Sequence, residues 1–575
     1  MIRRWVWFTV CAFLGLVMLV CGLLVPAHLR AVDKSVIQKA ARRSTGLIEH
    51  GLALVNEKKL GPAQLTYQAA QQEEVPNRDK LGLALTNAAV QHPAWQTWGD
   101  AETHLEILFG KDHVLPKSGS LPFTEFVLRQ DNRARAMALL RVASRPASQE
   151  LLRCRELTNT AIFSPSLSAS GQALDAALSI CGLLIEEGQL TPKLSEAFES
   201  MALAANRGGN SERLEQALLD LMSLGQRFNW GQLVAFANRI EDAETLRRLA
   251  NFVRKADGQL AVLFSAVEMS GRPAEVASYL LTFSESGLKD LGASLRFGAG
   301  GVNALLERNQ RLYSSSLVND LAGYDPFTAW WQFAVDCCWR NPGFALSMKW
   351  ALYLAGGFLI AAALHFARPA VSTLERPLQV RGFHIAREIL FALGFLVVVL
   401  LLSEPFLAQE SQKVEFPFRL RLPTVGSTVP AGSLGVKTAA IMNQLDQRSL
   451  LTLLLFFVLQ GLIYISCLFK LAEIRRQRVP SRIKLRLLEN EEHLFDAGLY
   501  LGFAGTIISL ILVSLGFIKP SLMAAYSSTS FGIIFVSIFK IFHLRPARRK
   551  ILLEAESTAS DQIPQGVSRP LAAPL

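Results

Sequence analysis

Residues 497–518 read AGLYLGFAGTIISLILVSLGFI, an apolar run without a single charged side chain. A helix of about 20 such residues is long enough to cross the hydrocarbon core of a bilayer. Five further runs have a similar character, at about 5–25, 346–366, 389–404, 450–469 and 521–542. The sequence therefore predicts an all-α membrane protein, with an N-terminal anchor and a C-terminal bundle of five transmembrane helices.

Composition agrees with this class, because half of the 575 residues are apolar and only 19% are charged. The net charge of +11 at pH 7 would also suit a nucleic-acid-binding protein. The basic residues, however, cluster beside the apolar runs, where orientation in the membrane explains them more simply. We expect no nucleic-acid partner.

Loops rich in lysine and arginine stay on the cytoplasmic side of a membrane. Arg3 and Arg4 precede the first run, and basic clusters also fill 368–387, 470–486 and 540–550. If the chain crosses the membrane six times, all of these basic segments lie on the same side. The pattern predicts a multi-pass protein, of a bacterial inner membrane by our interpretation, with both termini in the cytoplasm.

The apolar runs divide the chain into segments of different character. We expect a large extracytoplasmic domain, two membrane helices, an extracytoplasmic loop, three more membrane helices and a disordered cytoplasmic tail. The expected boundaries are 1–28 for the anchor, then 29–343, 344–404, 405–448, 449–545 and 546–575. The first run could instead be a signal peptide cleaved near Val25-Pro26-Ala27, although its length favours an anchor.

The large domain shows apolar positions at helical spacing, as in Leu246, Leu249 and Val253, and no strand alternation. Turn signals such as Gly271-Arg272-Pro273 separate stretches of helical length. Short connections favour antiparallel helix pairs, and the recurring phrases Gly231-Gln232-Leu233 and Gly258-Gln259-Leu260 indicate stacked helical hairpins of the solenoid type. We expect such a domain to bind or space partners.

Catalytic and metal-binding patterns are missing from the sequence. Gly298-Ala299-Gly300-Gly301 lacks the lysine and preceding strand of a phosphate loop and indicates a turn. Ser286 and Lys289 have SxxK spacing without its companion motifs. We expect no enzyme activity, cofactor or metal.

Two cysteines of the large domain, Cys154 and Cys181, could form a disulfide in an oxidising compartment. Buried free thiols are the alternative.

Small and hydroxylated residues recur in the last two runs. Tyr500 is followed by Gly502, Gly505 and Thr506, and Thr529 is followed by Gly532. Small residues allow membrane helices to approach closely, and threonine hydroxyls bond to backbone or line a polar path. We expect Gly502, Gly505 and Gly532 to pack the helices, with a polar face beside them.

These motifs resemble the MotA/TolQ/ExbB proton-channel family, whose second helix carries a Tyr-x-Gly-x-x-Gly-Thr phrase and whose third carries a Thr-x-x-Gly-Leu phrase. The basic stretch Leu468–Arg476 is similar to the exit from that family's first helix. The resemblance covers about 450–545. It implies that Thr506 and Thr529 line a pore, and that a partner helix bearing an intramembrane Asp packs against them.

The resemblance implies an oligomeric subunit of a proton-motive-force-coupled envelope complex, whose outer domain engages envelope proteins or polymer. The last two runs contain no acidic residue, which an intramembrane proton relay would require. A non-conducting scaffold is therefore the alternative, in which the glycines and threonines only pack helices.

Overall fold

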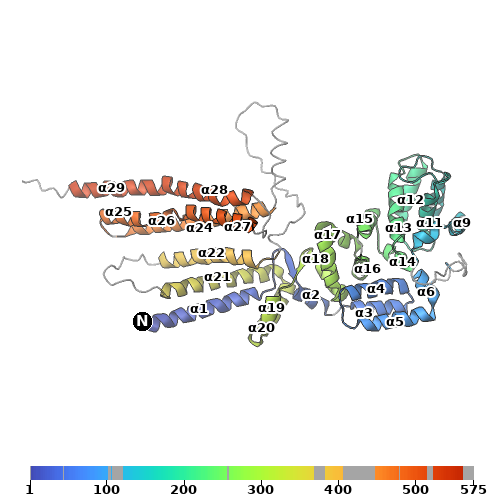
Figure 1. The fold of residues 1–575 in the computed structure, drawn as a ribbon, viewed down its shortest axis with the longest axis horizontal. Helices are drawn as coiled ribbons and strands as arrows, with labels where there is room; N and C mark the ends of the chain where they lie inside the picture. Colours follow the sequence, from blue (N-terminus) through green and yellow to red (C-terminus); the bar gives the residue numbers. More distant parts are fainter. Residues whose placement is uncertain are drawn as a thin grey trace, which may run out of the picture. The chain divides into compact units, whose positions relative to one another are not determined.

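The computed structural model describes residues 2–42, 44–101, 105, 121–255, 258–367, 383–405, 447–477, 479–514 and 522–560, and these are mostly helical (Figure 1). They form two compact units. One comprises 31–315 and is called the helical domain below. The other comprises 1–30 with 316–575 and is called the membrane-helix unit.

The helical domain contains many helices of moderate length and two strands of three residues. Its elements are β1 (Ala31–Asp33), α2 (Lys34–Ala41), α3 (Leu47–Asn56), α4 (Leu60–Gln72), α5 (Arg78–Gln91), α6 (Pro93–Trp98), α8 (Phe123–Leu128), α9 (Gln130–Arg141), α10 (Pro146–Arg153), a 3₁₀ turn (Cys154–Glu156), α11 (Gln172–Glu186), α12 (Pro192–Asn206), α13 (Glu212–Gly225), α14 (Trp230–Ala237), α15 (Ala243–Lys255), α16 (Leu260–Ser270), α17 (Pro273–Leu295), α18 (Gly298–Arg308) and β2 (Arg311–Tyr313).

Local sequence signals set where several of these helices begin. Thr191 accepts a hydrogen bond from the amide of Leu194 and precedes a proline at the first position of α12. Asn229 and Gln232 form a reciprocal capping box at the start of α14. The Gly298 stretch, expected as a turn, instead forms the first turn of α18.

Neighbouring helices pack as hairpins, including α3 with α4, α16 with α17 and α17 with α18. The chain also closes on itself, because α16 packs on α4 and α18 packs on α2. β1 and β2 pair in parallel, with Val32 opposite Leu312. This strand pair was not expected from the sequence, since three residues are too few to show alternation.

The membrane-helix unit consists of longer helices. They are α1 (Ile2–Leu23), α19 (Ser316–Ala322), α20 (Asp325–Arg340), α21 (Pro342–Ala367), α22 (Phe383–Ser403), α24 (Gln447–Arg476), α25 (Ser481–Asn490), α26 (Glu492–Phe495), α27 (Ala497–Ser514), α28 (Leu522–Phe539), a π-helical turn (Lys540–Leu544) and α29 (Arg545–Ser560).

Among the described residues, three helical segments are long and apolar enough to cross a membrane: Trp5–Leu23, Pro342–Leu364 and Ser528–Glu556. A fourth, Ala497–Ile507, is apolar but shorter. The chain is therefore a mostly helical protein with three helices capable of spanning a membrane. The six predicted spans coincide with α1, α21, α22, α24, α27 and α28, but their number stays a prediction.

One expected boundary differs from the division into compact units. α19 and α20, assigned by sequence to the outer domain, belong to the membrane-helix unit. The indole of Trp330 on α20 donates to the carbonyl of Cys21 in α1, at 3.0 Å, which ties α20 to the first membrane helix. The loop expected at 405–448 lies outside the described residues for nearly all its length.

The tail expected to be disordered from 546 is helical as far as Ser560. α29 packs against α25. Both helices share a buried apolar cluster with the end of α24, because amphipathic helices of this length need a partner for their apolar side. The cluster consists of Cys467, Leu471, Ile474, Leu488, Phe495, Phe539, Ala547 and Ile551.

Candidate functional site

The helices α24, α27 and α28 pack together and carry the glycines and threonines singled out in the sequence. Gly498, Gly502 and Gly505 recur at intervals of four and three residues, so they share one side of α27. That side faces α28. A Cβ atom on Gly502 would lie 2.8 Å from the carbonyl oxygen of Ser528, and one on Gly532 would lie 2.7 Å from that of Gly498. The two backbones therefore approach too closely for any side chain.

Thr506 and Thr529 meet across this contact, with their hydroxyl oxygens 2.5 Å apart. Each hydroxyl oxygen also lies within hydrogen-bond distance of the carbonyl oxygen of Gly502, at 3.1 and 3.3 Å. Because a hydroxyl has one hydrogen to donate, one threonine donates to the other while the second donates to this carbonyl. The buried hydroxyl of Ser528 donates to the same carbonyl at 2.9 Å. Gly505 leaves room for this hydroxyl, since a Cβ there would lie 2.6 Å from it. The structure thus gathers three hydroxyls around one carbonyl, with the threonine pair half-buried.

A hydroxyl both donates and accepts, so a chain of hydroxyls can bind water or pass a proton along. The same bonds also satisfy polar groups between packed membrane helices. The geometry of the isolated chain is compatible with both roles.

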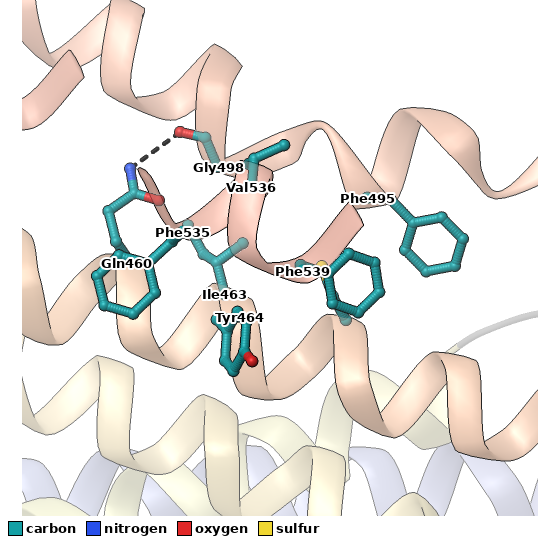
Figure 2. Close-up of a pocket in the computed structure, with 9 residues that line it drawn as sticks. Gln460, Ile463, Tyr464, Phe495, Gly498, Phe535, Val536 and Phe539 are labelled. Carbon is teal, nitrogen blue, oxygen red and sulfur yellow. Dashed lines mark hydrogen bonds between the residues drawn. The ribbon is translucent and has the colours of Figure 1, made fainter. Parts of the chain in front are cut away.

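A small pocket lies one turn further along the same three helices (Figure 2). Its volume is about 10 Å³, near the lower limit for one water molecule. Gln460, buried to 1% exposure, lines it and donates from Nε2 to the carbonyl of Gly498 at 2.9 Å. Its Oε1 has no partner within the described residues. Sequence analysis missed Gln460, although an amide inside an apolar run is the signal that could have found it.

Further polar side chains lie next to the pocket, on α24 and around the π-helical turn. The hydroxyl of Tyr464, whose ring lines the pocket (Figure 2), lies 2.9 Å from Nε2 of His543. His543 stands in the π-helical turn, a distortion frequent at functional sites. Lys540 in the same turn forms a 2.7 Å ion pair with Asp496, the acidic residue at the entrance to α27.

A second polar cluster, not found from the sequence, lies among α1, α21 and α22. Lys349 and Glu404 form an ion pair of 3.2 Å, with both side chains 1% exposed. Nδ1 of His28 lies 3.3 Å from the ammonium of Lys349. The sequence did contain a signal for this cluster, because Lys349 is the one basic residue among 344–364, inside an apolar run. We call His28, Lys349 and Glu404 the charge cluster.

The two cysteines considered for a disulfide are both buried free thiols in the helical domain. Burial raises the pKa of Cys154 to about 12, and burial raises the pKa of Cys181 well above its usual value. Such thiols react slowly. Among the described residues, no group of three His, Cys, Asp or Glu side chains could hold a metal ion.

Comparison of the chain with protein families, characterised proteins and solved structures finds no match.

Proposed function

We propose that this protein is an integral membrane subunit of a proton-motive-force-coupled complex, similar in its last three membrane helices to MotA/TolQ/ExbB proteins. In this proposal the chain oligomerises in a bacterial inner membrane, with both termini in the cytoplasm. The helical domain lies outside and engages envelope proteins or polymer.

The observation that carries the proposal is the hydroxyl cluster around the Gly502 carbonyl. Thr506 and Thr529 come from separate motifs of the resemblance, and their hydroxyls lie 2.5 Å apart. Both side chains remain partly exposed at the edge of the α27–α28 contact. A polar group facing hydrocarbon is unfavourable. A partner helix against this edge would cover the threonines and could place a carboxylate beside them.

Two further features support the proposal. α24, α25 and α29 share a buried apolar cluster and carry many Lys and Arg residues beyond the apolar runs, which would suit a cytoplasmic extension. The pocket at Gln460 continues the line of polar groups from the threonines towards Tyr464 and His543.

The partner must contribute the acidic group, because α27 and α28 contain no Asp or Glu. An intramembrane carboxylate is the expected element of a proton relay. The proposed partner is a single-span protein bearing an intramembrane Asp.

The test compares Thr506→Val and Thr529→Val with the wild type in the complex purified from native membranes. Valine keeps the shape of threonine and removes the hydroxyl, so complex yield should be unchanged. Proton flux into liposomes holding the complex should fall severalfold. Thr9→Val is the matched control, because Thr9 in α1 also bonds to its own helix, at 3.1 Å from the Trp5 carbonyl.

The scaffold alternative predicts a different pattern. An interhelical hydrogen bond in a membrane averages only about 0.6 kcal/mol, so both valine variants would keep full activity. Gly505→Leu and Gly532→Leu would then be the variants that lose assembly. That result would replace the channel proposal with the scaffold.

A further inference from the structure

The helix that continues α28 carries an exposed stripe of apolar and basic side chains. Ile541 and Phe542, in the π-helical turn, precede Arg545 by four and three residues, and Arg549 follows it by four. Residues at these intervals are neighbours on one side of a helix. All four are exposed, Ile541 to 52% and Phe542 to 68%. We call these four residues the α29 stripe.

The other side of α29 is covered by the protein itself. Ala547 and Ile551, four residues apart, are 3% and 5% exposed and belong to the buried apolar cluster shared with α24 and α25. Arg548 forms an ion pair with Glu489 of α25 at 3.3 Å. The α29 stripe therefore faces outwards, away from the helices on which α29 packs.

The surface around the stripe has an excess of positive charge. Segments 470–496 and 540–556 contain twelve Lys and Arg residues against seven Asp and Glu residues. Arg545 and Arg549 form no ion pair among the described residues. Four of the carboxylates are already engaged by other basic side chains, namely Glu473, Glu489, Glu491 and Asp496. The two arginines are therefore available to an external anion.

The position of the stripe along its helix indicates where that anion lies. The apolar segment Ser528–Glu556 has 29 residues. At 1.5 Å per residue it is about 43 Å long. This length matches a bilayer with its headgroup layers, about 40–45 Å, rather than the hydrocarbon core of about 30 Å. All arginines of this segment lie from Arg545 onward, so a span of this length places the stripe at the level of the headgroups.

We propose that the α29 stripe binds an anionic phospholipid of the surrounding membrane. Ile541 and Phe542 pack against the first methylenes of an acyl chain. Arg545 and Arg549 bind the phosphate, whose geometry the planar guanidinium matches. Basic clusters directly beyond a membrane helix are a recognised feature of anionic-lipid binding.

Other occupants fit the stripe less well. A second copy of this chain would bring the same positive charge, and like charges across an interface repel. A nucleic acid would pair with the arginines but leave Ile541 and Phe542 uncovered. The lipid site requires α28 to be a membrane helix, but it does not require that α27 and α28 conduct protons.

The test measures lipid binding to the full chain in a non-ionic detergent. Dioleoylphosphatidylglycerol is titrated in, and native mass spectrometry counts the lipid molecules retained. Dioleoylphosphatidylcholine, which has the same acyl chains and no net charge, is the comparison lipid. Wild type should retain the phosphatidylglycerol preferentially. Replacing Arg545 and Arg549 with glutamine should weaken its binding by about fivefold per arginine and leave phosphatidylcholine unaffected.

Two matched controls separate a site from general attraction. Arg482→Gln with Arg486→Gln removes two exposed arginines that are also four residues apart, on α25, and should leave lipid binding unchanged. Phe542→Ala should weaken phosphatidylglycerol binding, whereas Phe13→Ala, at a 67% exposed position in α1, should not.

Three results would overturn the proposal. The first is equal retention of the two lipids by wild type. The second is an equal loss of binding in the two double-arginine variants, because net charge alone would then explain the preference. The third is release of the lipid by inorganic phosphate or by a DNA duplex at constant ionic strength, since the arginines would then bind phosphate groups without any contribution from the acyl chain.

Discussion

Glu215 shows how one buried carboxylate organises a loop of the helical domain. It is 2% exposed and accepts hydrogen bonds from the amides of Ala161 and Phe163, both at 2.8 Å. Burial by itself would raise the pKa of Glu215, but bonds from the Ser211 hydroxyl and these amides lower it below the ordinary 4.5. The charged form is therefore the one that holds the loop.

We expect Glu215→Gln to loosen residues 161–163. Hydrogen bonds to a charged group are worth about 1.5–3 kcal/mol, so amide exchange in this loop should accelerate by about tenfold or more. Hydrogen exchange with mass spectrometry on the full chain measures this, with Glu196→Gln, at an exposed position on α12, as the control. Equal exchange in the two variants would contradict the assignment.

The pH dependence has a definite sign. Because folding lowers the pKa of Glu215, its stabilisation is complete above about 4.5 and is lost as pH falls through the lower folded-state value. The difference in exchange between wild type and Glu215→Gln should therefore be constant at neutral pH and shrink below about pH 4.5.

At the scale of the element, the contact between α27 and α28 depends on glycine backbones rather than on side chains. Close approach of this kind is the usual basis of helix association in membranes. α24 differs, because a Cβ on its Gly461 would meet nothing within 4 Å. The chain thus contains a critical glycine and a permissive one within the same bundle.

Alanine substitutions test this difference. Gly502→Ala and Gly532→Ala each place a Cβ within 3 Å of a carbonyl oxygen of the other helix, and overpacking typically costs about 1–3 kcal/mol. Gly461→Ala should be neutral or stabilise by up to about 1 kcal/mol, since alanine favours a helix. Thermal unfolding in detergent compares the three. Equal effects at Gly461 and Gly502 would disprove the close contact.

At the scale of the molecule, the chain divides into two units, and the helical domain is formed entirely by residues 31–315. The contacts that join the two ends of this domain, β1 with β2 and α4 with α16, all lie within it. A fragment of these residues should therefore fold without the membrane helices.

The excised fragment 31–315 is expected to be soluble and strongly helical by circular dichroism. Its intact mass should match free thiols at Cys154 and Cys181, as in the structure. An unfolded fragment would show that the domain needs the membrane-helix unit. A mass lower by two hydrogens would instead establish the disulfide.

Sequence by itself was sufficient for the features that depend on neighbouring residues. Apolar runs predicted the positions of six long helices, and helical periodicity predicted that the domain is helical, because each helix bonds to itself within four residues. The motifs also predicted that Gly502 packs against a neighbouring helix with the hydroxyl of Thr506 beside it, since residues four apart share one side of a helix.

Only the tertiary structure decided the features that join distant parts of the chain. Lys349 reaches Ala27 across 322 positions, and β1 pairs with β2 across a similar interval. The roles of Gln460 and of the helical α29 also became evident only from the tertiary structure, because their partners lie on other helices. No periodicity records such contacts: a lone lysine in an apolar run marks an unusual site, but its carboxylate and histidine partners become evident only when the helices pack.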